Sequence, residues 1–199
     1  INFISRKKNI EFNGSIYYTN LNNAIVRSNG TFNGIDSIMY DGSLSKVQTL
    51  KNSGKAYVFG FSYMINYKIN NNLNLKSSVS FNQSKDLSTK LPLRHSSPIF
   101  GQTSINFTKR NIKVSYYINY NGKKDISNFS PSELNKLYLY TKDGSPAWLT
   151  NNISFIYNIN YLAKINFSCE NIFDIHYRSY SSGISAPGRN FNIGLNMSF

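Results

Sequence analysis

The sequence predicts an all-β protein, a transmembrane antiparallel up-and-down β-barrel in which about eight strands are visible. Three observations support this fold class: a period-2 alternation of apolar and polar residues, a composition rich in aromatic residues, and connections that alternate between short and long. Aromatic residues make up 15% of the chain and charged residues 16%, whereas soluble domains carry about 25% charged residues. Tyr and Phe favour strands, and the abundant Asn and Ser are poor helix formers.

The alternation is clearest in the last segment, where Phe191, Ile193 and Leu195 share one face and asparagine or glycine occupies the other. Residues two apart point to the same face of a strand, so each such segment predicts one strand with an apolar face and a polar face. The predicted strands are, in order, 10–18, 57–69, 73–82, 103–108, 112–120, 153–161, 163–170 and 190–199, and residues 1–4 are a candidate for the stub of another.

The connections between these strands alternate in length. Short turns are expected near 7–9, 70–72, 110–111 and 160–161. Long loops are expected near 28–54, 85–100, 123–147 and 174–188. Short turns on one side and long loops on the other are typical of bacterial outer-membrane barrels.

The residues on the two faces indicate which surface meets lipid. The polar faces carry mostly Asn, Ser, Thr and Gly with scattered Lys, unlike the dense Lys and Glu of a solvated sheet. Strands of about ten residues can cross a bilayer at a tilt. We therefore expect the apolar faces to meet lipid, with Trp148 and the tyrosines near strand ends in the interfacial girdle. Lys76, Lys113 and Lys164 on the polar faces could line a lumen and attract anionic ligands, and the favoured interpretation is that they are solvated residues of that lumen.

Other function classes find little support in the composition. The net charge of +13 can mark a nucleic-acid binder, and a soluble basic β-protein of that kind is one alternative, but the apolar stripes argue against it. Cys169 is the only cysteine and is expected to be a small apolar filler. The acidic residues show no paired spacing, so we expect no enzyme, no cofactor and no metal site. The sequence contains no run of about eighteen apolar residues, so it does not predict a transmembrane helix.

The last strand carries a further signal. Gly194, Met197 and Phe199 lie in an alternating segment that ends on an aromatic residue. This segment resembles the terminal strand that the barrel assembly machinery recognises in outer-membrane proteins. An extended strand with a free edge can pair with a strand of such a partner.

Several motifs, in the same order and spacing, extend this resemblance over nearly the whole chain. They are GKAYVFG at 54–60, PLRHSSP at 92–98 with FG at 100–101, DGSPAW at 143–148, ENIFD at 170–174, YR at 177–178, SGI at 182–184 and PGRNF at 187–191. Together they resemble the carboxyl-terminal part of a TonB-dependent outer-membrane receptor.

The resemblance implies that residues 1–199 are the carboxyl-terminal segment of a 22-stranded barrel, with the plug domain and the amino-terminal strands absent. The intact receptor would import a scarce solute such as a ferric siderophore, haem, cobalamin or an oligosaccharide across the bacterial outer membrane. Its partners would be outer-membrane lipids, the barrel assembly machinery, the plug domain, the TonB complex and the imported ligand, with no nucleic acid. The alternative is a small autonomous outer-membrane barrel with an adhesion or structural role.

Two sets of residues are singled out within the loops. A structural role is expected at the junction of strand and loop for Asn171, Phe173, Asp174, Gly188 and Arg189, with Asp174 capping a turn through its side chain. Contact with the ligand is expected from the loop aromatics Phe129, Tyr138, Tyr140, Tyr177 and Tyr180. His95 is expected to organise its loop and not to bind metal.

Overall fold

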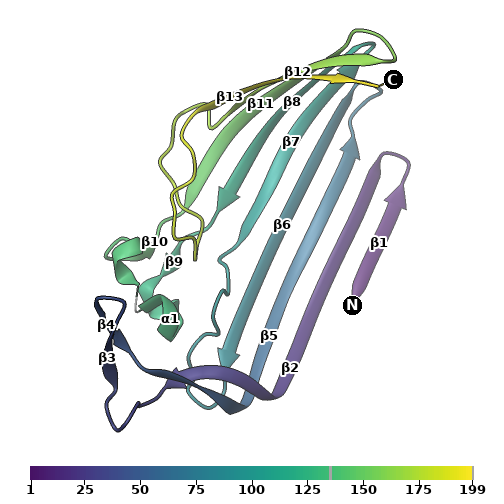
Figure 1. The fold of residues 1–199 in the computed structure, drawn as a ribbon. Helices are drawn as coiled ribbons and strands as arrows, with labels where there is room; N and C mark the ends of the chain where they lie inside the picture. Colours follow the sequence, from purple (N-terminus) through teal and green to yellow (C-terminus); the bar gives the residue numbers. More distant parts are fainter. Residues whose placement is uncertain (135, 199) are drawn as a thin grey trace.

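The protein folds into one large antiparallel sheet with its loops gathered on one side (Figure 1). The computed structural model describes residues 1–134 and 136–198. Nine strands of the described chain form the sheet, in the order β1 (Asn2–Lys7), β2 (Ile10–Asn29), β5 (Gln48–Lys68), β6 (Leu73–Asp86), β7 (Phe100–Lys109), β8 (Ile112–Asn121), β11 (Trp148–Asn158), β12 (Ala163–Glu170) and β13 (Asn190–Met197).

The remaining elements lie within the loops. Two small hairpins pair β3 (Ser37–Tyr40) with β4 (Ser43–Lys46), and β9 (Lys124–Asp125) with β10 (Gly144–Ser145). Between β9 and β10 lie a short α1 (Pro131–Leu134) and two 3-10 turns at Ile126–Asn128 and Leu137–Leu139. No described helix is long and apolar enough to cross a membrane.

The up-and-down order of the sheet confirms the predicted fold class. Each strand pairs antiparallel with the next strand of the sheet along the chain. The stub expected at 1–4 is a full strand, β1, which pairs Asn2–Lys7 with residues 10–15 of β2. The sheet does not close on itself, because β1 and β13 each have one unpaired edge in the described structure.

Three of the predicted strands have wrong boundaries. The strands predicted at 10–18 and 57–69 extend into the region expected to be a loop, so that β2 and β5 have 20 and 21 residues. The pairing of Asn20–Asn29 with residues 48–57 supplies the ladder hydrogen bonds that the weak local alternation did not predict. The strand predicted at 153–161 instead runs from Trp148 to Asn158, because the Asn160 side chain accepts hydrogen bonds from the backbone N–H groups of Leu162 and Ala163 in a tight turn.

The strand register joins the apolar faces of the strands into continuous rows. One row crosses eight strands through Ile10, Tyr67, Leu75, Ile105, Tyr116, Ile153, Cys169 and Phe191. The next row, on the opposite face, contains Glu11, Asn66, Lys76, Ser104, Tyr117 and Asn152. The alternation of single strands therefore becomes one apolar face and one polar face for the whole sheet.

The apolar face is exposed, the reverse of a soluble β-protein, and loops cover part of the polar face. Ile16 and Tyr18 on the apolar face are 65% and 67% exposed. On the polar face, Asn152 is buried, and its side-chain oxygen accepts a hydrogen bond from the backbone N–H of Asn171 in a loop. Large apolar patches on this scale mark contact with a partner or a membrane, and an outward apolar band is what a transmembrane barrel presents to lipid.

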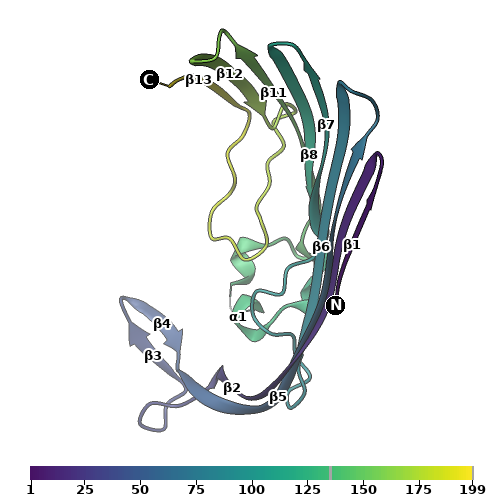
Figure 2. The same cartoon turned by 90° about the vertical axis from the view of Figure 1, so that its right-hand side faces the viewer.

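The long loops and the short turns lie at opposite ends of the strands, here called the long-loop end and the short-turn end. Figure 2 shows that the sheet is curved and that α1 and the long loops lie on its concave side. The expected girdle position of Trp148 is wrong. Its register partner is Asn121 on the polar face, and its ring packs against Tyr177 with 4.3 Å between ring centroids, so a loop on the concave side covers it.

Candidate ligand-binding cleft at the long-loop end

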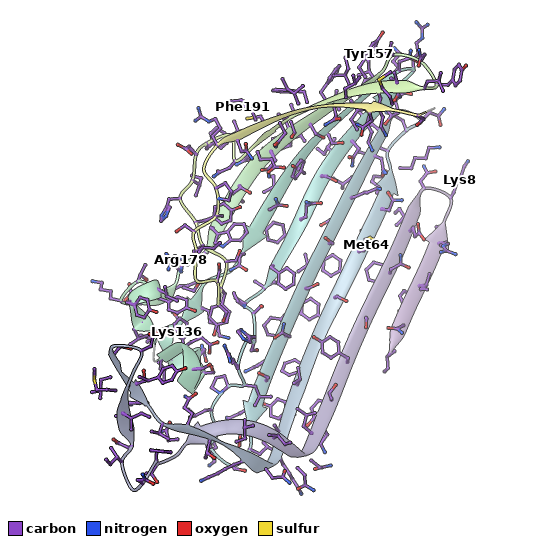
Figure 3. All side chains as sticks on the ribbon, in the orientation of Figure 1. Lys8, Met64, Lys136, Tyr157, Arg178 and Phe191 are labelled. Atoms are coloured by element: carbon purple, nitrogen blue, oxygen red, sulfur yellow. The ribbon has the colours of Figure 1, made fainter. Side chains whose placement is uncertain are left out.

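A cleft opens at the long-loop end between the β3–β4 hairpin and the loops that follow β6, β8 and β12. Its volume is about 640 Å³, within the range of small-molecule sites. The charged and aromatic residues that line it are Lys46, Arg94, His95, Glu133, Lys136, Tyr138 and Tyr140. Figure 3 shows Lys136 and Arg178 at this end of the sheet, with Lys8 and Tyr157 at the short-turn end.

The β3–β4 hairpin forms one wall of the cleft. Asp41 and Gly42 connect its strands, and both have positive φ angles, 47° and 72°. Two such residues form the tight turn that matches the twist of a hairpin, and Asp-Gly is a preferred pair for it. The Ser43 hydroxyl donates to the Tyr40 carbonyl oxygen at 3.2 Å. The hairpin lies within a region expected to be loop, and its Asp-Gly pair was the signal that could have predicted it.

An aromatic cluster lies beside the cleft and holds two loops together. The ring of Phe129 lies 4.6 Å from that of Tyr140 and 5.6 Å from that of Tyr180, centroid to centroid. Phe129 is only 1% exposed, so it packs inside the cluster. Burial raises the pKa of both tyrosine hydroxyls, and the Glu133 carboxylate adds to the rise at Tyr180. Both phenols therefore remain neutral at physiological pH.

Glu133 joins three loops through its buried carboxylate. Its Oε2 accepts hydrogen bonds from the backbone N–H (3.1 Å) and the hydroxyl of Ser130. Its Oε1 accepts from the Ser181 hydroxyl at 3.0 Å and the His95 backbone N–H at 3.5 Å. Glu133 is 4% exposed. The spacing Ser-x-x-Glu at 130–133 is that of a capping box, a signal that the search for paired acidic residues in the sequence did not consider.

Lys124 and Arg178 connect the same loops from two further positions. The Lys124 Nζ donates to the Ser96 carbonyl oxygen and lies 4.3 Å from the centroid of the Tyr180 ring. Burial lowers the pKa of Lys124, and the Glu133 carboxylate opposes that shift. Arg178 donates from Nη1 to the Leu139 carbonyl oxygen at 2.8 Å. The charged groups thus hold the inner side of the cleft in one arrangement.

The side chains that line the cleft give it a positive charge. Lys46, Arg94 and Lys136 carry the positive charges, and Glu133 is the only carboxylate among the described lining residues. Because the oxygens of Glu133 already accept hydrogen bonds from neighbouring loops, the cations face the cleft without an acidic partner. Cations and phenol groups in one concave site favour an anionic or metal-chelating solute.

The structure separates the five predicted loop aromatics. Tyr138 and Tyr140 line the cleft, and Tyr138 is 80% exposed. Phe129 and Tyr180 lie in the buried cluster, and Tyr177 packs on Trp148. Contact with a ligand stays a prediction for all five, and the geometry favours Tyr138 and Tyr140. Among the described residues, no group of three or more His, Cys, Asp or Glu could hold a metal ion.

Four of the five residues expected to be structural meet at the base of the last long loop. Asn171 donates from Nδ2 to the Ile175 carbonyl oxygen and accepts from the Ile175 backbone N–H, at 2.8 and 2.9 Å. Asp174 Oδ1 accepts from the Arg189 backbone N–H at 2.7 Å. A Cβ at Gly188 would lie 2.5 Å from that same oxygen. Phe173 stays exposed.

Two of the three predicted assembly residues, Gly194 and Met197, fall on the edge strand β13. Gly194 pairs with Asn166 of β12, and a Cβ at Gly194 would lie 2.8 Å from the Asn166 side-chain oxygen. Met197 is the last residue of β13 and is exposed. Phe199 lies outside the described residues. Recognition of this segment by the assembly machinery stays a prediction.

Comparison with known proteins identifies the fold. No protein-family model and no curated protein matches the sequence. Among solved structures, the copper transporter OprC matches 98% of this chain with a TM-score of 0.77 and 13% identity. The FrpB iron transporter from Neisseria meningitidis matches 100% with a TM-score of 0.70 and 15% identity. The ferric yersiniabactin uptake receptor FyuA from Yersinia pestis matches 100% with a TM-score of 0.66 and 13% identity.

The chain spans only part of these proteins, 31% of OprC and 29% each of FrpB and FyuA. The matched proteins are named as a copper transporter, an iron transporter and a ferric yersiniabactin uptake receptor. The fold implied by the sequence motifs is therefore confirmed. The chain has the fold of a carboxyl-terminal barrel portion of a TonB-dependent outer-membrane receptor.

Proposed function

We propose that this chain is part of an outer-membrane receptor that imports a scarce solute and that the cleft at the long-loop end captures this solute. The observation that carries the proposal is the cationic, tyrosine-lined cleft on a fold shared with copper and iron transporters. The chain binds and passes its solute without changing it chemically. An anionic ferric chelate fits the charge of the cleft better than a neutral oligosaccharide does.

The two faces of the sheet support the proposed location. The exposed apolar face would contact outer-membrane lipids, and the polar face would line the interior of the closed barrel. In the intact receptor, that interior would hold the plug domain, through which the TonB complex supplies energy. Strand β13 would meet the assembly machinery through its unpaired edge.

Removing two cleft cations tests the proposal. In the full-length protein, the double substitution Arg94→Gln and Lys136→Gln is expected to reduce uptake of the imported solute by about tenfold or more, since hydrogen bonds from a charged group each contribute roughly 1.5–3 kcal/mol. The measurement is uptake of radiolabelled ferric chelates, haem, copper, cobalamin and an oligosaccharide by cells that carry the gene or lack it.

A matched control removes the same charge elsewhere at this end. Lys90 and Lys142 are exposed basic residues of the long loops and do not line the cleft. Their double substitution with Gln is expected to keep uptake within about twofold of the unmodified protein. If deletion of the gene changes the uptake of none of these solutes, the proposed function is wrong. If both double variants lose uptake equally, the cleft is not the capture site.

A further inference from the structure

A second hollow lies at the short-turn end, on the polar face of β5 to β8. Its volume is about 280 Å³, and three lysines from three strands line it: Lys68, Lys76 and Lys113. The other lining residues are asparagines, one threonine and one leucine, with no carboxylate among those that the structure describes. The hollow is therefore strongly basic and rich in amide groups.

The strand register explains why the three ammonium groups share one side of the sheet. Lys68 lies opposite Asn74, Lys76 opposite Asn66, and Lys113 opposite Thr108. All of these positions belong to the polar face, so the side chains project from neighbouring strands to the same side. Three like charges in one hollow repel one another, and a bound anion offsets that repulsion.

The nearest acid on the polar face is already paired. Glu11 lies opposite Asn66 in the register of β2 and β5. Its Oε1 accepts a hydrogen bond from Arg6 Nε at 2.9 Å, as part of an ion pair. Glu11 therefore does not neutralise the charge of the three lysines.

Two amides of the hollow also have an open hydrogen-bonding position. The side-chain oxygens of Asn66 and Asn74 are buried and have no partner. The neighbouring Asn106 is fully engaged instead, since it donates to the Ser104 hydroxyl at 3.0 Å and accepts from the Ser115 hydroxyl at 2.7 Å. A half-turn of either open amide would present its NH₂ group at the same place. A buried polar atom without a partner is unfavourable, and an anionic oxygen could accept a hydrogen bond from the NH₂ group presented in this way.

We propose that this hollow is a binding site for a small anion whose charge is carried by carboxylate or phosphate oxygens. Lysine ammonium groups would supply the charge, and the asparagine amides would orient the oxygens by hydrogen bonds. The site is distinct from the cleft, because Gln48 lines the cleft and Lys68 lines the hollow, at the two ends of β5. At roughly 3.3 Å per residue, this 21-residue strand can extend to about 65–70 Å.

The inference goes beyond the proposed function, because anion binding at the hollow can be measured without transport. Only a role of the hollow in transport rests on the proposed function. In that role, an anionic solute that leaves the cleft would bind a second positively charged site at the short-turn end of the barrel wall. A neutral solute would not be held there.

Pyrophosphate is a suitable probe for the site. We expect isothermal titration calorimetry, on the full-length protein in detergent at low ionic strength, to show pyrophosphate binding. The triple substitution Lys68→Gln, Lys76→Gln and Lys113→Gln is expected to weaken that binding by at least about tenfold. The control removes three lysines from the same end that do not line the hollow, Lys7, Lys8 and Lys109, and is expected to change the affinity less than about twofold.

Three results would overturn the inference. Equal loss of binding in the triple variant and its control would mean that only the overall charge attracts pyrophosphate. Unchanged binding in the triple variant would place the anion elsewhere. Absence of binding to the unmodified protein, with a lowered unfolding temperature in the triple variant, would mean that carboxylates of the protein itself neutralise the lysines. Each of these results leaves the uptake experiment on the cleft unaffected, so the two proposals can fail separately.

Discussion

Replacing Glu133 with alanine is expected to release the loops at the long-loop end while the nine-stranded sheet stays folded. The substitution leaves the buried hydroxyl and backbone N–H of Ser130 and the hydroxyl of Ser181 without their acceptor. It also removes the negative charge that favours the ammonium form of the buried Lys124. We expect a loss of about 2–4 kcal/mol of local stability, since each buried donor left unpaired costs roughly 1–3 kcal/mol.

Limited proteolysis of the full-length protein in detergent measures this loss. Cleavage within residues 122–147 and 171–189 is expected to accelerate by more than about tenfold in the alanine variant, with no change in the unfolding temperature of the barrel. Glu133→Gln keeps one acceptor oxygen and is expected to give an intermediate rate. Asp143→Ala removes an exposed carboxylate of the same loop and serves as the control. Equal cleavage rates in all three variants would show that Glu133 does not hold these loops.

The sheet was largely predictable because its signals are local. The alternation in 190–197 and the paired short turns depend on residues close together in the chain, and the structure has β13 and the turns where they were expected. The extensions of β2 and β5 were not predictable in this way. Near Asn20–Asn29 the alternation fails, and the strand exists because residues 48–57 pair with it across the long connection. Such pairing is a tertiary effect that overrides local pattern.

The cleft was only partly predictable, for a different physical reason. Loop aromatics were expected to contact ligand, but exposure depends on packing between loops that are far apart in the sequence. Phe129 and Tyr180 are buried by each other and by Tyr140, whereas Tyr138, two residues away from Tyr140, is exposed. Lys124 falls within the long loop expected at 123–147, and its burial under Tyr180 follows from the same packing.

Replacing Asn171 with alanine is expected to destabilise the base of the last long loop by about 2–4 kcal/mol. Its side chain makes hydrogen bonds in both directions with the backbone of Ile175, and it is 3% exposed. Its φ angle of 51° lies in the left-handed region, which asparagine tolerates better than alanine does. The measurement is the urea concentration at which Trp148 fluorescence changes, because Trp148 packs on Tyr177 of that loop.

Two further substitutions separate the side-chain effect from the backbone effect. Asn171→Gly relieves the left-handed backbone but loses the hydrogen bonds, so it is expected to recover only the smaller part of the loss, about 1 kcal/mol. Asn171→Asp keeps the acceptor for the Ile175 N–H and loses the donor to the Ile175 carbonyl, and is expected to be intermediate. The exposed turn residue Asn111 provides the control, and its alanine variant should unfold like the unmodified protein. If Asn171→Gly restores full stability, backbone conformation alone requires asparagine here, and the hydrogen bonds to Ile175 contribute nothing measurable.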